Sequence, residues 1–177
     1  MLNGLAPLLS PRTRLLILGS FPSVRSLAQQ QYYGHPRNQF WPLLQALWPD
    51  GPVGSAADSY QARCAWLLSK GLGLWDVYAA CEREGSLDSR IRQTVVNDFS
   101  AVRRLCPQLQ AIAHHGGESF KHARHTATLG LPVFRLPSTS PANAAWAFER
   151  KLAAWNDVFI QQGLVQSDER FTSSSDR

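Results

Sequence analysis

The feature that most constrains the fold is a short, uninterrupted apolar run near the N-terminus. Residues 14–19 read Arg-Leu-Leu-Ile-Leu-Gly, so an extended segment here is apolar on both faces. Strands buried on both faces are typical of parallel sheets, in which helices cover each side. Three later segments also have strand character, at residues 73–78, 109–113 and 132–136. The sequence therefore predicts a central four-stranded parallel sheet.

Amphipathic segments alternate with these strands and predict the helices. Their apolar spacing and capping residues favour helices over residues 38–48, 56–69, 97–105, 118–128 and 141–162. The polar, charged segment 80–93 is expected to run over the surface. Alternating strands and helices predict an α/β fold with three α/β/α layers. We expect one domain over residues 1–165, followed by a polar, Ser-rich and disordered tail over 166–177.

Composition limits the classes of function. The 177 residues suit a single domain, and the net charge of +5 favours polyanionic partners such as nucleic acid, although this signal is weak alone. Cys64, Cys81 and Cys106 are too few and too widely spaced for a disulfide framework, a zinc ribbon or a four-thiolate cluster. No signal peptide or membrane-spanning run is apparent. We expect a cytoplasmic, nucleoid-associated monomer with no membrane partner.

The carboxyl ends of the predicted strands carry the most unusual residues of the chain. Ligands of parallel sheets bind at this edge. The segments that follow the strands are residues 20–23, 76–78, 114–117 and 137–141, and they combine hydroxyl, carboxylate, imidazole and glycine groups. The sequence therefore predicts one composite site built from all four segments.

Two motifs in these regions carry a resemblance to a known family. One comprises Gly19-Ser-Phe-Pro-Ser and, further along, His-Pro-Arg-Asn-Gln-Phe-Trp over residues 35–41. The other is Leu-Pro-Ser-Thr-Ser-Pro-Ala-Asn over residues 136–143. Together they resemble the uracil-DNA glycosylase superfamily, and most closely its hypoxanthine-DNA glycosylase branch, over residues 16–159.

The resemblance implies a monofunctional glycosylase of base-excision repair. Such an enzyme flips a deaminated base out of double- or single-stranded DNA and hydrolyses its N-glycosidic bond. Hypoxanthine is the favoured base and uracil is possible. The resemblance implies no metal and no cofactor, and no Lys stands at a matched motif position to form a Schiff base.

The resemblance also assigns the catalytic role to Asn38, which would orient the attacking water. The alternative interpretation is that Asn38 caps the following helix, and both roles are compatible. Most superfamily members carry Asp or Asn before the motif proline, where this chain has Phe21. Phe21 is expected to form a wall of the base pocket. Tyr33, favoured over Tyr32, is expected to stack on the base.

Asp76 and His115 complete the expected base pocket. A carboxylate at Asp76 would accept the N1–H of hypoxanthine or the N3–H of uracil and would disfavour adenine. The alternatives are that Asp76 caps a turn or acts as a general acid. His115 is expected to wall the pocket, beside a backbone nest at Gly116 and Gly117. A zinc site and an esterase oxyanion loop are weaker interpretations of the same residues, since the chain lacks a Gly-x-Ser-x-Gly elbow.

The expected DNA contacts are hydroxyl and cationic groups around this pocket. The second motif implies a loop that grips phosphates, and hydroxyls and backbone amides bind phosphate without reading sequence. The expected DNA-binding residues are Ser20, Ser23, Arg37, Ser138, Thr139 and Ser140. Two other functions remain open. One is a lesion-binding module without hydrolysis, which Phe21 favours, and the other is a hydrolase of free nucleosides.

Overall fold

The computed structural model describes residues 1–52 and 59–167. Its centre is a parallel sheet in the order β3-β2-β6-β7, which confirms the predicted sheet. The register is continuous, since Leu18 of β2 lies opposite Trp75 of β3 on one side and His114 of β6 on the other. The strands are β2 (Leu15–Gly19), β3 (Leu72–Asp76), β6 (Ala111–His115) and β7 (Val133–Leu136).

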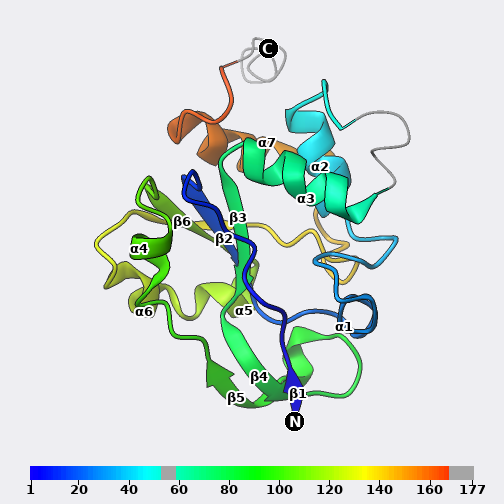
Figure 1. Ribbon diagram of the computed structural model, residues 1–177. Coiled ribbons are helices and arrows are strands. Elements are labelled where there is room, and N and C mark those ends of the chain that lie inside the picture. The colour runs from blue at the N-terminus through cyan, green and yellow to red at the C-terminus, as the bar shows by residue number, and fades with distance from the viewer. Residues whose placement is uncertain (53–58, 168–177) are drawn as a thin grey trace.

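The apolar run that begins β2 supplies both faces of the sheet. Leu15 and Ile17 belong to one buried cluster, and Leu16 and Leu18 belong to another. Because successive side chains of a strand point to opposite faces, this single run joins two cores. Three helices pack on the first face, and α4 and α6 lie on the opposite side (Figure 1). These helices are α2 (Phe40–Leu47), α3 (Tyr60–Ser69), α7 (Phe148–Gln161), α4 (Val102–Leu105) and α6 (Ala123–Ala127).

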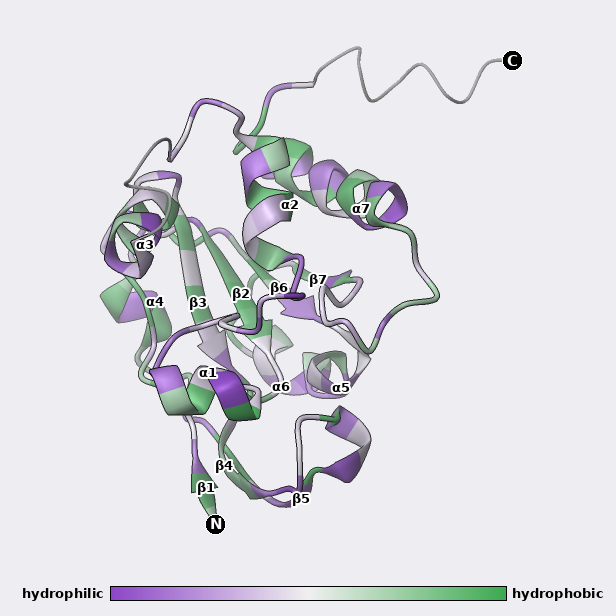
Figure 2. Cartoon of the chain, turned by 90° about the vertical axis from the view of Figure 1, so that its right-hand side faces the viewer, coloured by the Kyte–Doolittle hydropathy of each residue, from purple (hydrophilic) through white to green (hydrophobic). Residues whose placement is uncertain are grey.

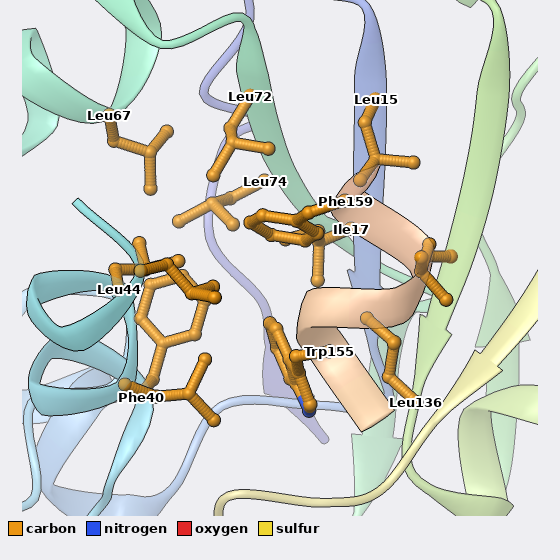
Figure 3. Packing of buried hydrophobic residues seen from close by; sticks show 14 of the residues in the cluster. Leu15, Ile17, Phe40, Leu44, Leu67, Leu72, Leu74, Leu136, Trp155 and Phe159 are labelled. Atoms are coloured by element: carbon orange, nitrogen blue, oxygen red, sulfur yellow. The ribbon is translucent and has the colours of Figure 1, made fainter. Parts of the chain in front are cut away.

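The larger core is built around aromatic side chains of α7 and α2. Trp155 and Phe159 of α7 are completely buried and pack with Phe40 of α2 over the leucines of the sheet (Figure 3). The indole N–H of Trp155 donates to the carbonyl of Pro137, 3.0 Å away, so burial leaves no unpaired indole donor. Apolar and polar bands recur along α7, as expected of an amphipathic helix whose apolar side chains gather on one face (Figure 2).

A second, antiparallel sheet lies beyond the carboxyl ends of the parallel strands (Figure 1). Residues 80–93, expected to run over the surface, include the end of β4 and the start of β5 of this sheet, two strands that the sequence did not predict. All five residues of β5 are exposed, so no apolar alternation marks the strand, and backbone pairing with β4 defines it. The sheet comprises β1 (Leu2–Asn3), β4 (Tyr78–Glu82) and β5 (Arg92–Val96).

Several helices differ from their predicted extents. The expected helix over 97–105 is the single turn of α4, and that over 118–128 is divided into α5 (Gly117–Phe120) and α6. The helix expected from residue 141 begins at Phe148, because Ser140 and Asn143 bond to nearby backbone groups and hold turns. The start expected at residue 56 and most of the predicted tail lie outside the described residues. None of the described helices is long and apolar enough to cross a membrane.

Candidate active site

The four parallel strands end at one cavity of about 600 Å³. Gly19 lies opposite Asp76, and His115 lies opposite Leu136, so the last residues of neighbouring strands are level with one another. The chain passes from β2 to β3 on one side and later places β6 and β7 on the other, so the strand order reverses at β2. The cavity therefore occupies the position at which open α/β sheets bind ligands.

Asp76 projects a carboxylate into this cavity from the end of β3. Its side chain is 5% exposed, and its Oδ2 atom has no hydrogen-bond partner in the described part of the chain. Burial, and next the nearby charge of Asp88, raise the pKa of Asp76 from 3.8 to about 7, although Arg83 opposes the rise. A buried carboxylate oxygen without a partner is costly unless a ligand pairs with it. Asp76 is therefore the strongest candidate for a group that binds substrate.

Gly19 allows the Asp76 carboxylate to lie against the end of β2. A Cβ atom on Gly19 would lie 2.5 Å from Asp76 Oδ1 and 3.4 Å from the hydroxyl of Tyr33. The first of these distances is too short for any side chain. Glycine is thus needed here because two polar groups of the cavity approach the backbone closely.

His115 is a neutral hydrogen-bonding group between two walls of the cavity. The backbone N–H of Thr139 donates to its Nε2 at 2.9 Å, so the proton is on Nδ1, which donates to the hydroxyl of Tyr33 at 2.7 Å. Burial, with a smaller contribution from the charge of Lys151, lowers the pKa of His115 from 6.5 to about 3. The ring therefore stays uncharged at neutral pH and fixes the position of the Tyr33 hydroxyl.

Tyr33 is held by stacking as well as by this hydrogen bond. Its ring stacks on Phe40 at a centroid distance of 4.0 Å and lies 5.0 Å from the His115 ring. Its φ of 54° falls in the left-handed region, which is strained for a bulky residue and is often found at functional sites. Tyr32 and Tyr33 both line the cavity, and the hydroxyl of Tyr32 donates to the Ala6 carbonyl.

Asn38 faces the cavity with its amide orientation fixed by two donors. Its Oδ1 accepts the backbone N–H of Phe40 at 3.0 Å and the hydroxyl of Thr139 at 2.7 Å. Because the Phe40 N–H requires an oxygen acceptor, the Nδ2 group is the part of the amide left for a ligand; within the described residues it has no partner. The amide therefore supports the turn before α2 and also offers N–H donors to the cavity.

The loop after β7 forms the opposite wall. Ser138 and Ser140 line the cavity, as expected of a loop that could contact phosphate. Thr139 was expected to bind DNA as well, but it is completely buried, and its hydroxyl joins Asn38 and His115 behind the wall. Burial therefore assigns Thr139 to the framework of the site.

The remaining predicted residues divide between the cavity and its surroundings. Phe21 lines the cavity, with the Arg83 guanidinium 5.2 Å from its ring. Ser20 lines it too, and its hydroxyl donates to Asp88 Oδ1 at 2.7 Å. Ser23 lines the cavity as the N-cap of α1 (Val24–Gln29). Arg37 is exposed and is not part of the cavity wall.

The two consecutive histidines have different environments. His114 is completely buried, and its ring nitrogens lie 2.8 Å from the hydroxyls of Ser119 and Thr126, so it supports the fold rather than the cavity. His115, Gly116 and Gly117 line the cavity. Among the described residues, His, Cys, Asp and Glu side chains form no group of three or more suited to a metal ion.

Sequence reasoning missed the segment that closes the other side of the cavity. Ser86, Leu87 and Asp88, between β4 and β5, line it, and Asp88 is the first residue of the short 3₁₀ helix η2 (Asp88–Arg90). The charge of this segment suggested a solvated surface. The hydrogen bond between Ser20 and Asp88, which holds the segment at the cavity, joins residues 68 positions apart. The one local signal for a hairpin in the sequence was Gly85, whose φ is 71° in the structure.

Comparison with known proteins agrees with this geometry. The model of the Uracil DNA glycosylase superfamily matches residues 6–159. Proteins named hypoxanthine DNA glycosylase from Methanosarcina acetivorans and Methanosarcina barkeri are 36% and 35% identical, each over 89% of this chain and 97% of the relative. A solution NMR structure from Methanosarcina acetivorans, described as a candidate uracil DNA glycosylase, is 34% identical with a TM-score of 0.78, over 91% of this chain and 98% of that one. The chain belongs to the uracil DNA glycosylase superfamily, whose members hydrolyse N-glycosidic bonds.

Proposed function

We propose that this protein is a monofunctional DNA glycosylase that removes hypoxanthine from DNA. The observation that carries the proposal is the buried, unpartnered Oδ2 of Asp76 in a cavity formed by the motif residues. The cavity volume of about 600 Å³ lies within the usual range of small-molecule sites. The names of the two Methanosarcina relatives, both called hypoxanthine DNA glycosylase, support hypoxanthine as the base, and uracil is a second candidate substrate.

Asp76 is proposed to read the edge of the flipped base. In its ionised form the carboxylate accepts the N1–H of hypoxanthine, whereas adenine presents a lone pair at N1 and is disfavoured. Tyr33, Phe21 and His115 form the surrounding walls, and Tyr33 offers an aromatic surface to the base. Uracil presents a similar N–H at its edge, so pocket size would decide between the two bases.

Asn38 is proposed to hold the attacking water. Its Nδ2 group donates to the water oxygen and leaves a second lone pair of that oxygen to attack C1′. The C1′–N9 bond breaks with its electron pair remaining on the base, and the water adds to C1′ and loses a proton to solvent. An amide accepts no proton at neutral pH, so stabilisation of the departing anionic base must supply much of the rate.

Hydrolysis without strand cleavage is supported by the absence of lysine among the cavity-lining residues. Lys151 is buried nearby, but its Nζ donates to Gln39 Oε1 at 2.9 Å and is not part of the cavity wall. A Schiff base with the sugar would need an amine that reaches C1′.

The test is incubation with duplexes that hold one deoxyinosine or one deoxyuridine, followed by alkali. Strand cleavage at the lesion only after alkali, and its loss in Asn38→Ala, would support the proposal, and the faster substrate identifies the base. Cleavage of neither duplex, with lesion binding intact, would instead support a binding module. Release of base from free inosine at a comparable rate would support a nucleoside hydrolase.

A further inference from the structure

A second carboxylate accompanies Asp76 in the cavity. Both Asp76 and Asp88 line it, and consecutive residues at the end of β2 hold the two groups. The backbone of Gly19 lies against the Asp76 carboxylate. The hydroxyl of the next residue, Ser20, donates to Asp88 Oδ1 at 2.7 Å. Recognition of hypoxanthine through its N1–H needs only Asp76, so the proposed function leaves the charge of Asp88 unused.

Neither carboxylate is paired with a cation of the protein. Within the described residues, Asp76 and Asp88 form no ion pair, and Asp76 Oδ2 has no hydrogen-bond partner. The guanidinium of Arg83 lies nearby, but it donates to the carbonyls of Gly85 and Pro22. The charge of Asp88 contributes to the raised pKa of Asp76, so the two groups repel one another. A cationic ligand beside them would relieve this repulsion.

The positive charge of the cavity wall lies at the other edge of the sheet. Among the described residues that line the cavity, the one lysine or arginine is Arg135 of β7. The strand order β3-β2-β6-β7 places β7 three strands from Asp76, and the Arg135 guanidinium lies 5.4 Å from the ring of Phe120. The end of the cavity that holds the two aspartates is therefore its negative end.

A negative, aromatic-walled end suits a base that is itself cationic. N7-alkylated 6-oxopurines carry a positive charge in the imidazole ring and keep the N1–H that Asp76 is proposed to accept. The carboxylates attract this charge, and the aromatic ring of Tyr33, which also lines the cavity, attracts it further. Hypoxanthine and guanine are neutral, so they gain no such attraction from Asp88.

We propose that the cavity also takes cationic N7-alkylated 6-oxopurines, such as 7-methylguanine, and that Asp88 selects them. This inference rests on the proposed glycosylase function and adds a second class of substrate. The C1′–N9 bond breaks with its electron pair on the base, which neutralises the imidazolium ring, and water adds to C1′ and loses a proton to solvent. The base leaves uncharged, so the carboxylates do not oppose its departure. Undamaged guanine would leave as an anion beside them, which disfavours its release.

The test measures single-turnover release of 7-methylguanine and of hypoxanthine from duplexes of the same sequence. Mildly acidic buffer keeps the N1–H and the net positive charge of the alkylated base, and a sample without protein gives its spontaneous loss. The wild-type protein should release both bases above that background. Asp88→Asn keeps an oxygen for the Ser20 hydroxyl and removes the charge, so the 7-methylguanine rate should fall about tenfold relative to the hypoxanthine rate.

The matched control is Glu84→Gln, which removes an exposed carboxylate of the same hairpin that does not line the cavity. It should leave the ratio of the two rates unchanged. Release of hypoxanthine without 7-methylguanine by the wild-type protein would overturn this inference and leave the proposed function intact. Release of neither base would overturn both. An equal fall of the two rates in Asp88→Asn would indicate a role in folding or pocket shape and would overturn selection by charge.

A second measurement does not depend on turnover. Fluorescence anisotropy compares a duplex that holds 7-methylguanine on a hydrolysis-resistant 2′-fluoro sugar with one that holds the uncharged counterpart, 7-deaza-7-methylguanine. The wild-type protein and Glu84→Gln should bind the charged lesion about tenfold more tightly, and Asp88→Asn should lose this preference. Equal affinity of the wild-type protein for the two duplexes would overturn the proposal.

Discussion

Replacement of Asp76 by asparagine should stabilise the fold while it impairs base recognition. The folded-state pKa of about 7 lies above the ordinary value of 3.8, so the native protein retains a proton that the unfolded chain has lost between these pH values. Stability therefore falls as pH rises from 3.8 to about 7, and the penalty is complete above that range. This rise in pKa corresponds to about 4 kcal/mol of unfolding free energy.

Asparagine is nearly isosteric and carries no charge, so it removes this penalty. The stability of Asp76→Asn relative to the wild-type protein should increase by about 3 kcal/mol between pH 5 and pH 8. Urea unfolding at the two pH values, followed by far-ultraviolet circular dichroism, measures this difference directly. Groups that titrate in both proteins, such as His115, cancel in the comparison.

Asp157→Asn is the control, because it removes an exposed carboxylate of α7. Its effect should not change between the two pH values. If the relative stability of Asp76→Asn were also independent of pH, the buried carboxylate would not be titrating as described. The reasoning about its desolvation would then be refuted.

Three further outcomes are expected. Hypoxanthine release should rise as pH increases through about 7, because reading N1–H requires ionised Asp76, whereas a fall over this range in pH–rate profiles would favour a general acid. Thr139→Val should lower the single-turnover rate by about tenfold, because Asn38 loses a buried donor, and it should leave the circular dichroism spectrum unchanged. An unaltered rate would contradict the dependence of Asn38 on the Thr139 hydroxyl. Gly19→Ala should weaken binding to lesion duplexes by at least about tenfold in fluorescence anisotropy, because its Cβ would displace the Asp76 carboxylate, and native affinity would contradict that crowding.

The parallel sheet and the position of its site could be predicted from sequence for a physical reason. Strands buried on both faces must be apolar throughout, and a ligand can approach only where they end. The run at β2 and the polar residues directly after it therefore indicated both the sheet and its functional edge. Asp76 and His115 could be identified as candidate site residues from their positions at the ends of predicted strands.

The parts that were missed depend on partners distant in sequence. β5 is exposed in every residue and exists because β4 pairs with it, which no local pattern reports. The hydroxyl of Thr139 looked like a phosphate ligand because its partner, Asn38, is 101 residues away. Likewise, α7 begins after residue 147 because local side-chain bonds hold the loop before it in turns.

The hydrogen bonds of Thr139 also connect the loop proposed to contact phosphate with the Asn38 amide. This residue lies between the two serines that face the cavity, donates to His115 and Asn38, and accepts the backbone N–H of Gln39 through its carbonyl. A phosphate that draws the serine loop inward would therefore shift the Asn38 amide, which we propose holds the attacking water. A free nucleoside has no backbone phosphate to exert that pull. Discrimination between a lesion in a polymer and the same base on a lone sugar would then be mechanical, transmitted through one buried hydroxyl.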